Sequence, residues 1–159
     1  MNIFEFAKKM EMDGEKYYRR IAAKVENAGL QHVLNMLAED EVKHYNIISR
    51  MAQSEMPEMA DSSVLNNAKN VFEKMKGKPF NKNIGEIEMY RKAQRMEKDS
   101  VEFYEEKASE EEQAHRKEIL RKIAGEEKKH YFLLENIINF VNRPETWIED
   151  AEFNHLEDY

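Results

Sequence analysis

The sequence contains no cysteine, and only five glycines, three prolines and one tryptophan among its 159 residues. The absence of cysteine excludes disulfides, zinc–thiolate sites, iron–sulfur clusters and thiol chemistry. The shortage of glycine and proline argues against a β-sandwich and against a disordered chain. Together with a charged fraction of 36%, it favours a single domain built from long helices.

A basic surface stripe and a long apolar run are also missing. The formal net charge is −7, and residues of both signs are interspersed, so nucleic acids and anionic membranes are poor partners. The N-terminal segment has no apolar run long enough for a signal peptide or a membrane span. The cytoplasm is therefore the expected location.

Four segments carry an apolar stripe whose steps alternate between three and four residues, the period of a helix packed in a bundle. They cover residues 3–28, 30–53, 87–109 and 112–142. The links near Gly29 and at residues 109–112 are short, so each is expected to join two antiparallel helices. The pattern predicts an all-α four-helix bundle over residues 1–142, with Gly29 ending the first helix.

A long crossover, residues 54–86, separates the two predicted hairpins at residues 3–53 and 87–142. It is long enough to return the chain to the opposite end of the bundle. We expect it to contain a short helix, capped by Ser63, with one apolar face formed by Leu65, Ala68, Phe72 and Met75. In the acidic tail, residues 143–159, the side chains expected to contact the bundle are Trp147, Phe153 and Leu156.

The two hairpins repeat each other at a constant offset of 86 residues. Each copy carries one glutamate on its first helix and a Glu-x-x-His motif on its second. The repeated residues are Glu11 with Glu97, Tyr18 with Tyr104, Glu41 with Glu127, and His44 with His130.

The Glu-x-x-His motif places both side chains on one face of a helix, within reach of a common metal ion. By itself it is weak evidence in a chain so rich in glutamate, because His115 and His155 also follow a glutamate by three residues. Only His44 and His130 lie in apolar stripes and obey the repeat. We therefore expect His115, His155 and His32 to be solvated surface residues.

The four repeated glutamates are expected in the core, where an unpaired carboxylate is costly. No lysine or arginine lies centrally in any stripe, whereas two divalent cations would balance four carboxylates and two neutral imidazoles. Mixed carboxylate and imidazole donors suit iron or manganese, and zinc can substitute because its affinity is higher. The alternative is that the carboxyl groups are partly protonated or line a wet channel.

Two further repeated pairs can act around such a site. Tyr18 and Tyr104 lean back toward the glutamate layer, where each hydroxyl can bond a carboxylate of the opposite helix; ordinary aromatic packing explains them equally well. Asp40 and Glu126 precede the motif residues and can orient an imidazole, or can equally be exposed.

At these residues the chain resembles the ferritin-like di-iron superfamily, and within it the rubrerythrins. The matching segments are MEMDGEKYY with MEKDSVEFY, and EDEVKH with GEEKKH. The resemblance implies two iron ions that react with peroxide or dioxygen, with Glu41 and Glu127 bridging them. The iron ligands that it implies are Glu11, Glu41, His44, Glu97, Glu127 and His130.

The chain departs from the rubrerythrin pattern in two ways. It has no cysteine and so no rubredoxin domain, which means that electrons must come from a separate donor such as a rubredoxin. Rubrerythrins also carry an extra carboxylate ligand one turn after the third-helix glutamate, where this chain has Ser100. Asp99 and Glu102 face elsewhere on a regular helix, although a helix bulge can bring Asp99 inward.

Three functions fit these observations. The first is an oxidoreductase that reduces hydrogen peroxide with externally supplied electrons. The second is iron handling, by oxidising or holding Fe(II), and the third is a non-enzymatic partner-binding bundle. Because members of this superfamily commonly form dimers, we also expect a homodimer.

Overall fold

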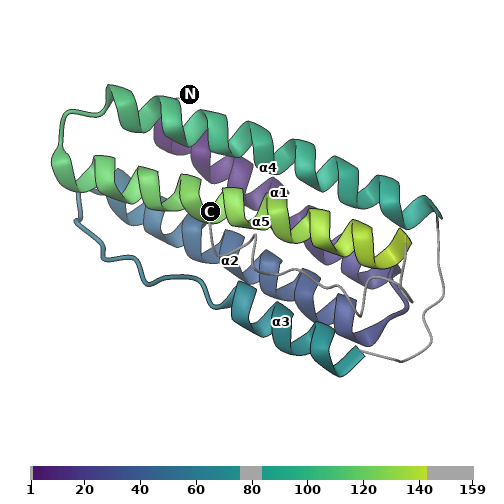
Figure 1. Ribbon diagram of the computed structural model, residues 1–159. Helices are drawn as coiled ribbons and strands as arrows, with labels where there is room; N and C mark the ends of the chain where they lie inside the picture. Colours follow the sequence, from purple (N-terminus) through teal and green to yellow (C-terminus); the bar gives the residue numbers. More distant parts are fainter. Residues whose placement is uncertain (1, 76–83, 143–159) are drawn as a thin grey trace.

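The protein is described by a computed structural model that covers residues 2–75 and 84–142. This part of the chain contains five α-helices: α1 (Ile3–Lys24), α2 (Ala28–Ala52), α3 (Val64–Met75), α4 (Ile84–Glu110) and α5 (Ala114–Asn142). The four long helices run side by side as two antiparallel hairpins, α1 with α2 and α4 with α5 (Figure 1). The predicted all-α, ferritin-like four-helix bundle is confirmed.

Helix α4 begins at the opposite end of the bundle from the end of α2, as expected for a long crossover (Figure 1). The short helix of this crossover, α3, packs against α2. Ala68, Phe72 and Met75 of the predicted apolar face are buried, and Leu65 is half-buried.

The first interhelical link differs from the prediction. Helix α1 ends at Lys24 rather than at residue 28, because the Asn27 side chain accepts a hydrogen bond from the Leu30 amide and caps α2. Gly29 consequently lies in the first turn of α2, where a Cβ atom would come within 2.9 Å of the Met75 sulfur on α3. The lack of a side chain at Gly29 permits close packing of α2 against α3, and this residue does not end a helix.

The core consists of two apolar clusters. One gathers Leu34, Ile137 and other residues around α3, and the other gathers Ile48, Ile123 and their neighbours toward the opposite end of the bundle. The buried glutamates and histidines belong to neither cluster. Apolar packing on both sides therefore holds these polar side chains in place.

Within the described ranges, no helix is both long enough and apolar enough to span a membrane. The predicted contacts of Trp147, Phe153 and Leu156 and the exposure of His155 lie outside the described residues.

Candidate metal centre

Six side chains from the four long helices converge in the middle of the bundle. Helix α1 contributes one glutamate and α4 another, while α2 and α5 each contribute a glutamate and a histidine one turn apart. Each is at most 3% exposed: Glu11, Glu41, His44, Glu97, Glu127 and His130. The structure thus brings together all six residues that the repeat singled out.

These residues form two overlapping groups that could each hold a metal ion. One contains Glu11 and His44, the other contains Glu97 and His130, and both include Glu41 and Glu127. In each group the donor atoms lie within 4.8 Å of one another. A carboxylate can bridge two adjacent metal positions only if it belongs to both, as Glu41 and Glu127 do here.

The donor atoms facing the centre lack hydrogen-bond partners. They include Nδ1 of both histidines, both carboxylate oxygens of Glu127 and one oxygen of each other glutamate. These atoms lie close together without meeting the geometry of a hydrogen bond. Nδ1 of His130 lies 2.8 Å from Glu97 and 3.2 Å from Glu41, and Nδ1 of His44 lies 3.0 Å from Glu127. Buried polar atoms are normally bonded, so a cluster of unbonded donors fits divalent metal ions.

The outer nitrogen of each imidazole is bonded to a carboxylate of the other hairpin. Nε2 of His44 lies 2.7 Å from Glu126 and Nε2 of His130 lies 2.8 Å from Asp40. This decides the open question about Asp40 and Glu126 in favour of an orienting role. A carboxylate acceptor keeps the proton on Nε2 and leaves Nδ1 free for a metal ion.

The two orienting carboxylates are held ionised. Burial by itself would raise the pKa of Asp40, but its contacts with His130 and Ser62 outweigh this and lower it to about 2. Burial likewise opposes ionisation of Glu126, yet His44 and Lys43 lower the pKa of that carboxyl. Both groups therefore act as acceptors at neutral pH.

Four of the central groups have a raised pKa and retain a proton when no metal ion replaces it: Glu41, His44, Glu97 and His130. Burial and then the negative charge of Glu127 raise the pKa of Glu97 to about 8. Burial, followed by the charges of Glu11 and Glu127, raises the pKa of Glu41 well above its ordinary value. Burial alone would lower the pKa of His130, but the surrounding carboxylates, first Glu97, raise it well above 6.5.

The two repeated tyrosines border this cluster but differ in their contacts. The Tyr104 hydroxyl donates a hydrogen bond to Glu11 over 2.9 Å, which decides the open question for this residue in favour of a carboxylate partner on another helix. The Tyr18 hydroxyl is buried without a hydrogen-bond partner. Burial and the nearby charge of Glu97 raise its pKa well above 10, so this hydroxyl keeps its proton.

The place of the extra rubrerythrin carboxylate is taken by Ser100, which is 9% exposed. Helix α4 is regular α-helix throughout Ile84–Glu110, and Asp99 and Glu102 are both exposed. The helix bulge that would bring Asp99 inward is therefore not formed.

The other two histidines in the described part of the chain, His32 and His115, belong to neither metal group. His32 is exposed as expected. The prediction for His115 is wrong, because this residue is partly buried and its Nε2 lies 2.8 Å from the Pro57 carbonyl oxygen. It ties the crossover to α5.

Sequence reasoning missed Ser62 and Lys43, which contact the orienting carboxylates. Lys43 has a repeat equivalent in Lys129, a signal that could have drawn attention to it. Ser62 lies in the crossover, which has no repeated counterpart in the other hairpin, so its role depends on the tertiary fold alone.

Gly14 lies on the face of α1 that contacts Glu41. A Cβ atom at this position would come within 2.9 Å of a Glu41 carboxylate oxygen and 3.3 Å of its carboxyl carbon. By contrast, a Cβ atom at Gly125 in α5 would meet nothing within 4 Å. The absence of a side chain at Gly14 lets a shared glutamate lie against α1.

Gly14→Ala is therefore expected to displace Glu41 and weaken metal binding. Gly125→Ala is the matched control and should raise the free energy of unfolding by about 0.5–1 kcal/mol, the usual gain for alanine over glycine in a helix. Titration with Co(II) and denaturant unfolding measure the two effects. Equal behaviour of the two variants would show that Gly14 places no constraint on Glu41.

A family model described as Rubrerythrin matches residues 2–138 of the chain. Comparisons with curated proteins and with solved structures gave no significant match. The matched range contains all six clustered residues and most of the described bundle. On this match and on its ferritin-like fold, the chain belongs to the rubrerythrin family.

Proposed function

We propose that the protein is a non-haem di-iron oxidoreductase that reduces hydrogen peroxide with electrons from a separate donor. The observation that carries the proposal is the set of buried, unbonded donor atoms in two overlapping groups. Carboxylates mixed with imidazoles favour iron or manganese, and zinc can substitute. The six proposed ligands are those that the repeat identified, with Glu41 and Glu127 shared.

Two ferrous ions bound there would supply the two electrons that, with two protons, convert hydrogen peroxide into two water molecules. The protein orients both imidazoles through Asp40 and Glu126. Apolar packing on both sides keeps bulk water from the centre. The Tyr18 hydroxyl is protonated and has no other partner, so we propose that it donates a hydrogen bond to the oxidant, while Tyr104 holds Glu11.

The proposal predicts that the di-ferrous protein is oxidised faster by peroxide than by dioxygen. Without a donor it should complete one turnover and stop, because the chain has no cysteine and hence no rubredoxin-type centre. Stopped-flow mixing with each oxidant measures the rates, and added reduced rubredoxin should restore cycling. An equal or faster reaction with dioxygen would contradict the peroxidase proposal.

Iron oxidation or storage is the second candidate function. It is favoured by Ser100, since the regular helix brings no fifth carboxylate into the cluster. Release of Fe(III) after reaction with dioxygen, without peroxide turnover, would support it. The third candidate, a non-enzymatic binding module, predicts that no redox-active metal ion copurifies with the protein from its native host.

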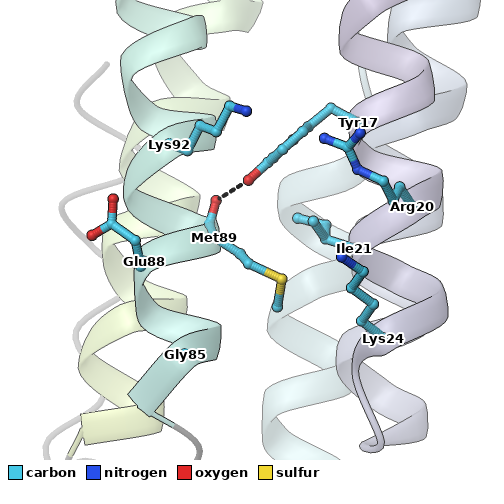
Figure 2. Close-up of a pocket in the computed structure, with 8 residues that line it drawn as sticks. All are labelled: Tyr17, Arg20, Ile21, Lys24, Gly85, Glu88, Met89 and Lys92. Atoms are coloured by element: carbon cyan, nitrogen blue, oxygen red, sulfur yellow. Dashed lines mark hydrogen bonds between the residues drawn. The ribbon is translucent and has the colours of Figure 1, made fainter.

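We propose that the electron donor docks at a cleft of about 320 Å³ between α1 and α4 (Figure 2). Arg20, Lys24 and Lys92 line it, and the Tyr17 hydroxyl spans it to the Met89 carbonyl over 2.7 Å. Among the described residues these three cations form no ion pair. Their positive charges complement the negative charge of an acidic carrier protein, although the net charge of the chain as a whole is negative.

The same cleft lies close to the metal centre. The Tyr17 ring forms part of its wall, and its centroid is 6.5 Å from that of Tyr18. Tyr18 in turn borders the buried glutamates. Two aromatic rings thus separate a docked donor from the centre.

Arg20→Glu with Lys24→Glu is expected to slow reduction by an acidic rubredoxin about tenfold at low salt, because opposite charges steer association. The effect should shrink as ionic strength rises. Lys117→Glu with Lys122→Glu on α5 is the matched control. Unchanged rates in the first variant would place the docking site elsewhere.

We also propose a homodimer. Phe6 and Met12 on α1 are 45% and 39% exposed, and the Phe6 ring packs 5.0 Å from that of Phe103 on α4. An apolar surface of this kind suits a second copy of the chain. Sedimentation of a 19.0 kDa species alone would contradict the dimer.

A further inference from the structure

The orienting carboxylates Asp40 and Glu126 occupy equivalent positions in the repeat, yet they are not held alike. The second partner of Asp40 is the Ser62 hydroxyl, whose oxygen lies 2.5 Å away and accepts from the Val64 amide. Glu126 instead receives the Ser62 backbone amide at 2.9 Å and the Lys43 ammonium group at 2.9 Å. Among the described residues, a lysine or arginine therefore contacts only one of the two orienting carboxylates.

The crossover causes this difference. The Lys43 ammonium group also donates to the Ala60 carbonyl oxygen over 3.0 Å, which fixes it beside Glu126. Lys129 is the repeat equivalent of Lys43, but in the described part of the chain its side chain forms no ion pair with Asp40 or any other acid. Because Ala60, which fixes Lys43, lies in the crossover and has no counterpart in the repeat, the repeat cannot reproduce the contact.

The position of Lys43 affects the metal groups unequally. By sharing Glu126 with Lys43, His44 has a weaker acceptor for its Nε2 proton, so its Nδ1 is a poorer donor to a metal ion. The ammonium charge, on a side chain only 28% exposed, also repels a cation bound near His44. Both effects act in the same direction. His130 shares its acceptor, Asp40, with the neutral Ser62 hydroxyl, and among the described residues no cation contacts that carboxylate.

We propose that Lys43 is a positioning residue that makes the two metal positions unequal. The position formed by Glu11, His44 and the shared glutamates then holds a divalent ion more weakly than the position formed by Glu97, His130 and the same glutamates. One ion is retained while the other exchanges. This inference rests on the proposed metal-binding role and is independent of the reaction.

Titration of the metal-free full chain with Co(II), followed by visible absorption and calorimetry, tests the inference. The wild type should bind in two steps of different affinity, and His44→Ala should remove the weaker step. Lys43→Met should tighten the weaker step about tenfold, within the range usual for groups that support metal ligands. Lys43→Arg should preserve the wild-type difference, and Lys129→Met should leave both steps unchanged.

Two equal affinities in the wild type would overturn the inference while leaving the proposed function intact. An equal effect from Lys129→Met would also overturn it, because the effect would then be one of general surface charge. If His44→Ala removed the tighter step, the order of the two positions would be wrong. A failure to bind Co(II) at all would refute the proposed metal role itself. Far-UV circular dichroism and denaturant unfolding of each metal-free variant separate these outcomes from misfolding.

Discussion

Replacing Glu41 by alanine is expected to abolish tight binding at both metal positions. Glu41 belongs to both groups and is 2% exposed, so its replacement removes a buried donor from each metal position. Loss of a shared carboxylate also leaves the two divalent cations with three carboxylates, so the charges of the loaded cluster no longer balance. Calorimetric titration with Fe(II) under anaerobic conditions, or with Co(II), measures the loss.

The control for this substitution is Glu112→Ala. Glu112 precedes His115 by three residues and so carries the same motif, but it is exposed and lies outside both groups. Its replacement should leave metal affinity unchanged. Equal losses from the two substitutions would show that the repeat and the buried cluster do not identify the metal ligands.

Removing the metal ions with a chelator is expected to destabilise the protein strongly. A metal ion that binds only the folded state raises the free energy of unfolding by about 2.7 kcal/mol per position when its free concentration is a hundred times the dissociation constant. Emptying both positions should therefore lower the melting temperature by roughly 10 °C or more. Differential scanning calorimetry with and without chelator gives the difference, and an unchanged melting temperature would contradict a structural contribution from metal.

The stability of the metal-free protein should fall as pH rises from about 5 to 8. Glu97 keeps its proton in the folded chain up to a pKa of about 8, whereas the unfolded chain releases it near 4.5. The pKa of His44 is also raised well above 6.5, since nearby carboxylates outweigh the lowering effect of burial. The folded state thus binds more protons over this range, and linkage makes its stability decrease.

The metal-loaded protein should show the opposite trend, because metal binding displaces those protons and strengthens as pH rises. The difference in melting temperature between the loaded and chelated forms should therefore widen from pH 5 to pH 8. A series of melting curves for both forms measures it. A constant difference would show that the central groups carry no displaceable protons.

Much of the bundle was predictable because helical periodicity is local. The apolar stripes identified all four long helices and α3, and the offset of 86 residues separated His44 and His130 from His32, His115 and His155. Burial of four acidic stripe positions followed from the same pattern. Residue spacing along the chain, within a helix or between the two repeats, was sufficient for each of these predictions.

Helix ends and individual contacts were less predictable. Gly29 was assigned to a helix end, whereas Asn27 caps α2 and Gly29 accommodates α3. Whether Asp40 and Glu126 were exposed or orienting could not be decided from spacing, since each bonds a histidine on the other hairpin. Contacts between residues more than eighty positions apart depend on how the hairpins pair.

By itself, the sequence determined the helical class, the duplicated hairpin and the six residues of the cluster, because each is encoded by a repeat along the chain. Only the tertiary structure decided that Ser62 and Lys43 contact the orienting carboxylates, that Tyr104 but not Tyr18 has a hydrogen-bond partner, and that His115 holds the crossover. The physical reason is that the crossover lies along one side of a nearly symmetric bundle, so equivalent residues in the two repeats meet different neighbours.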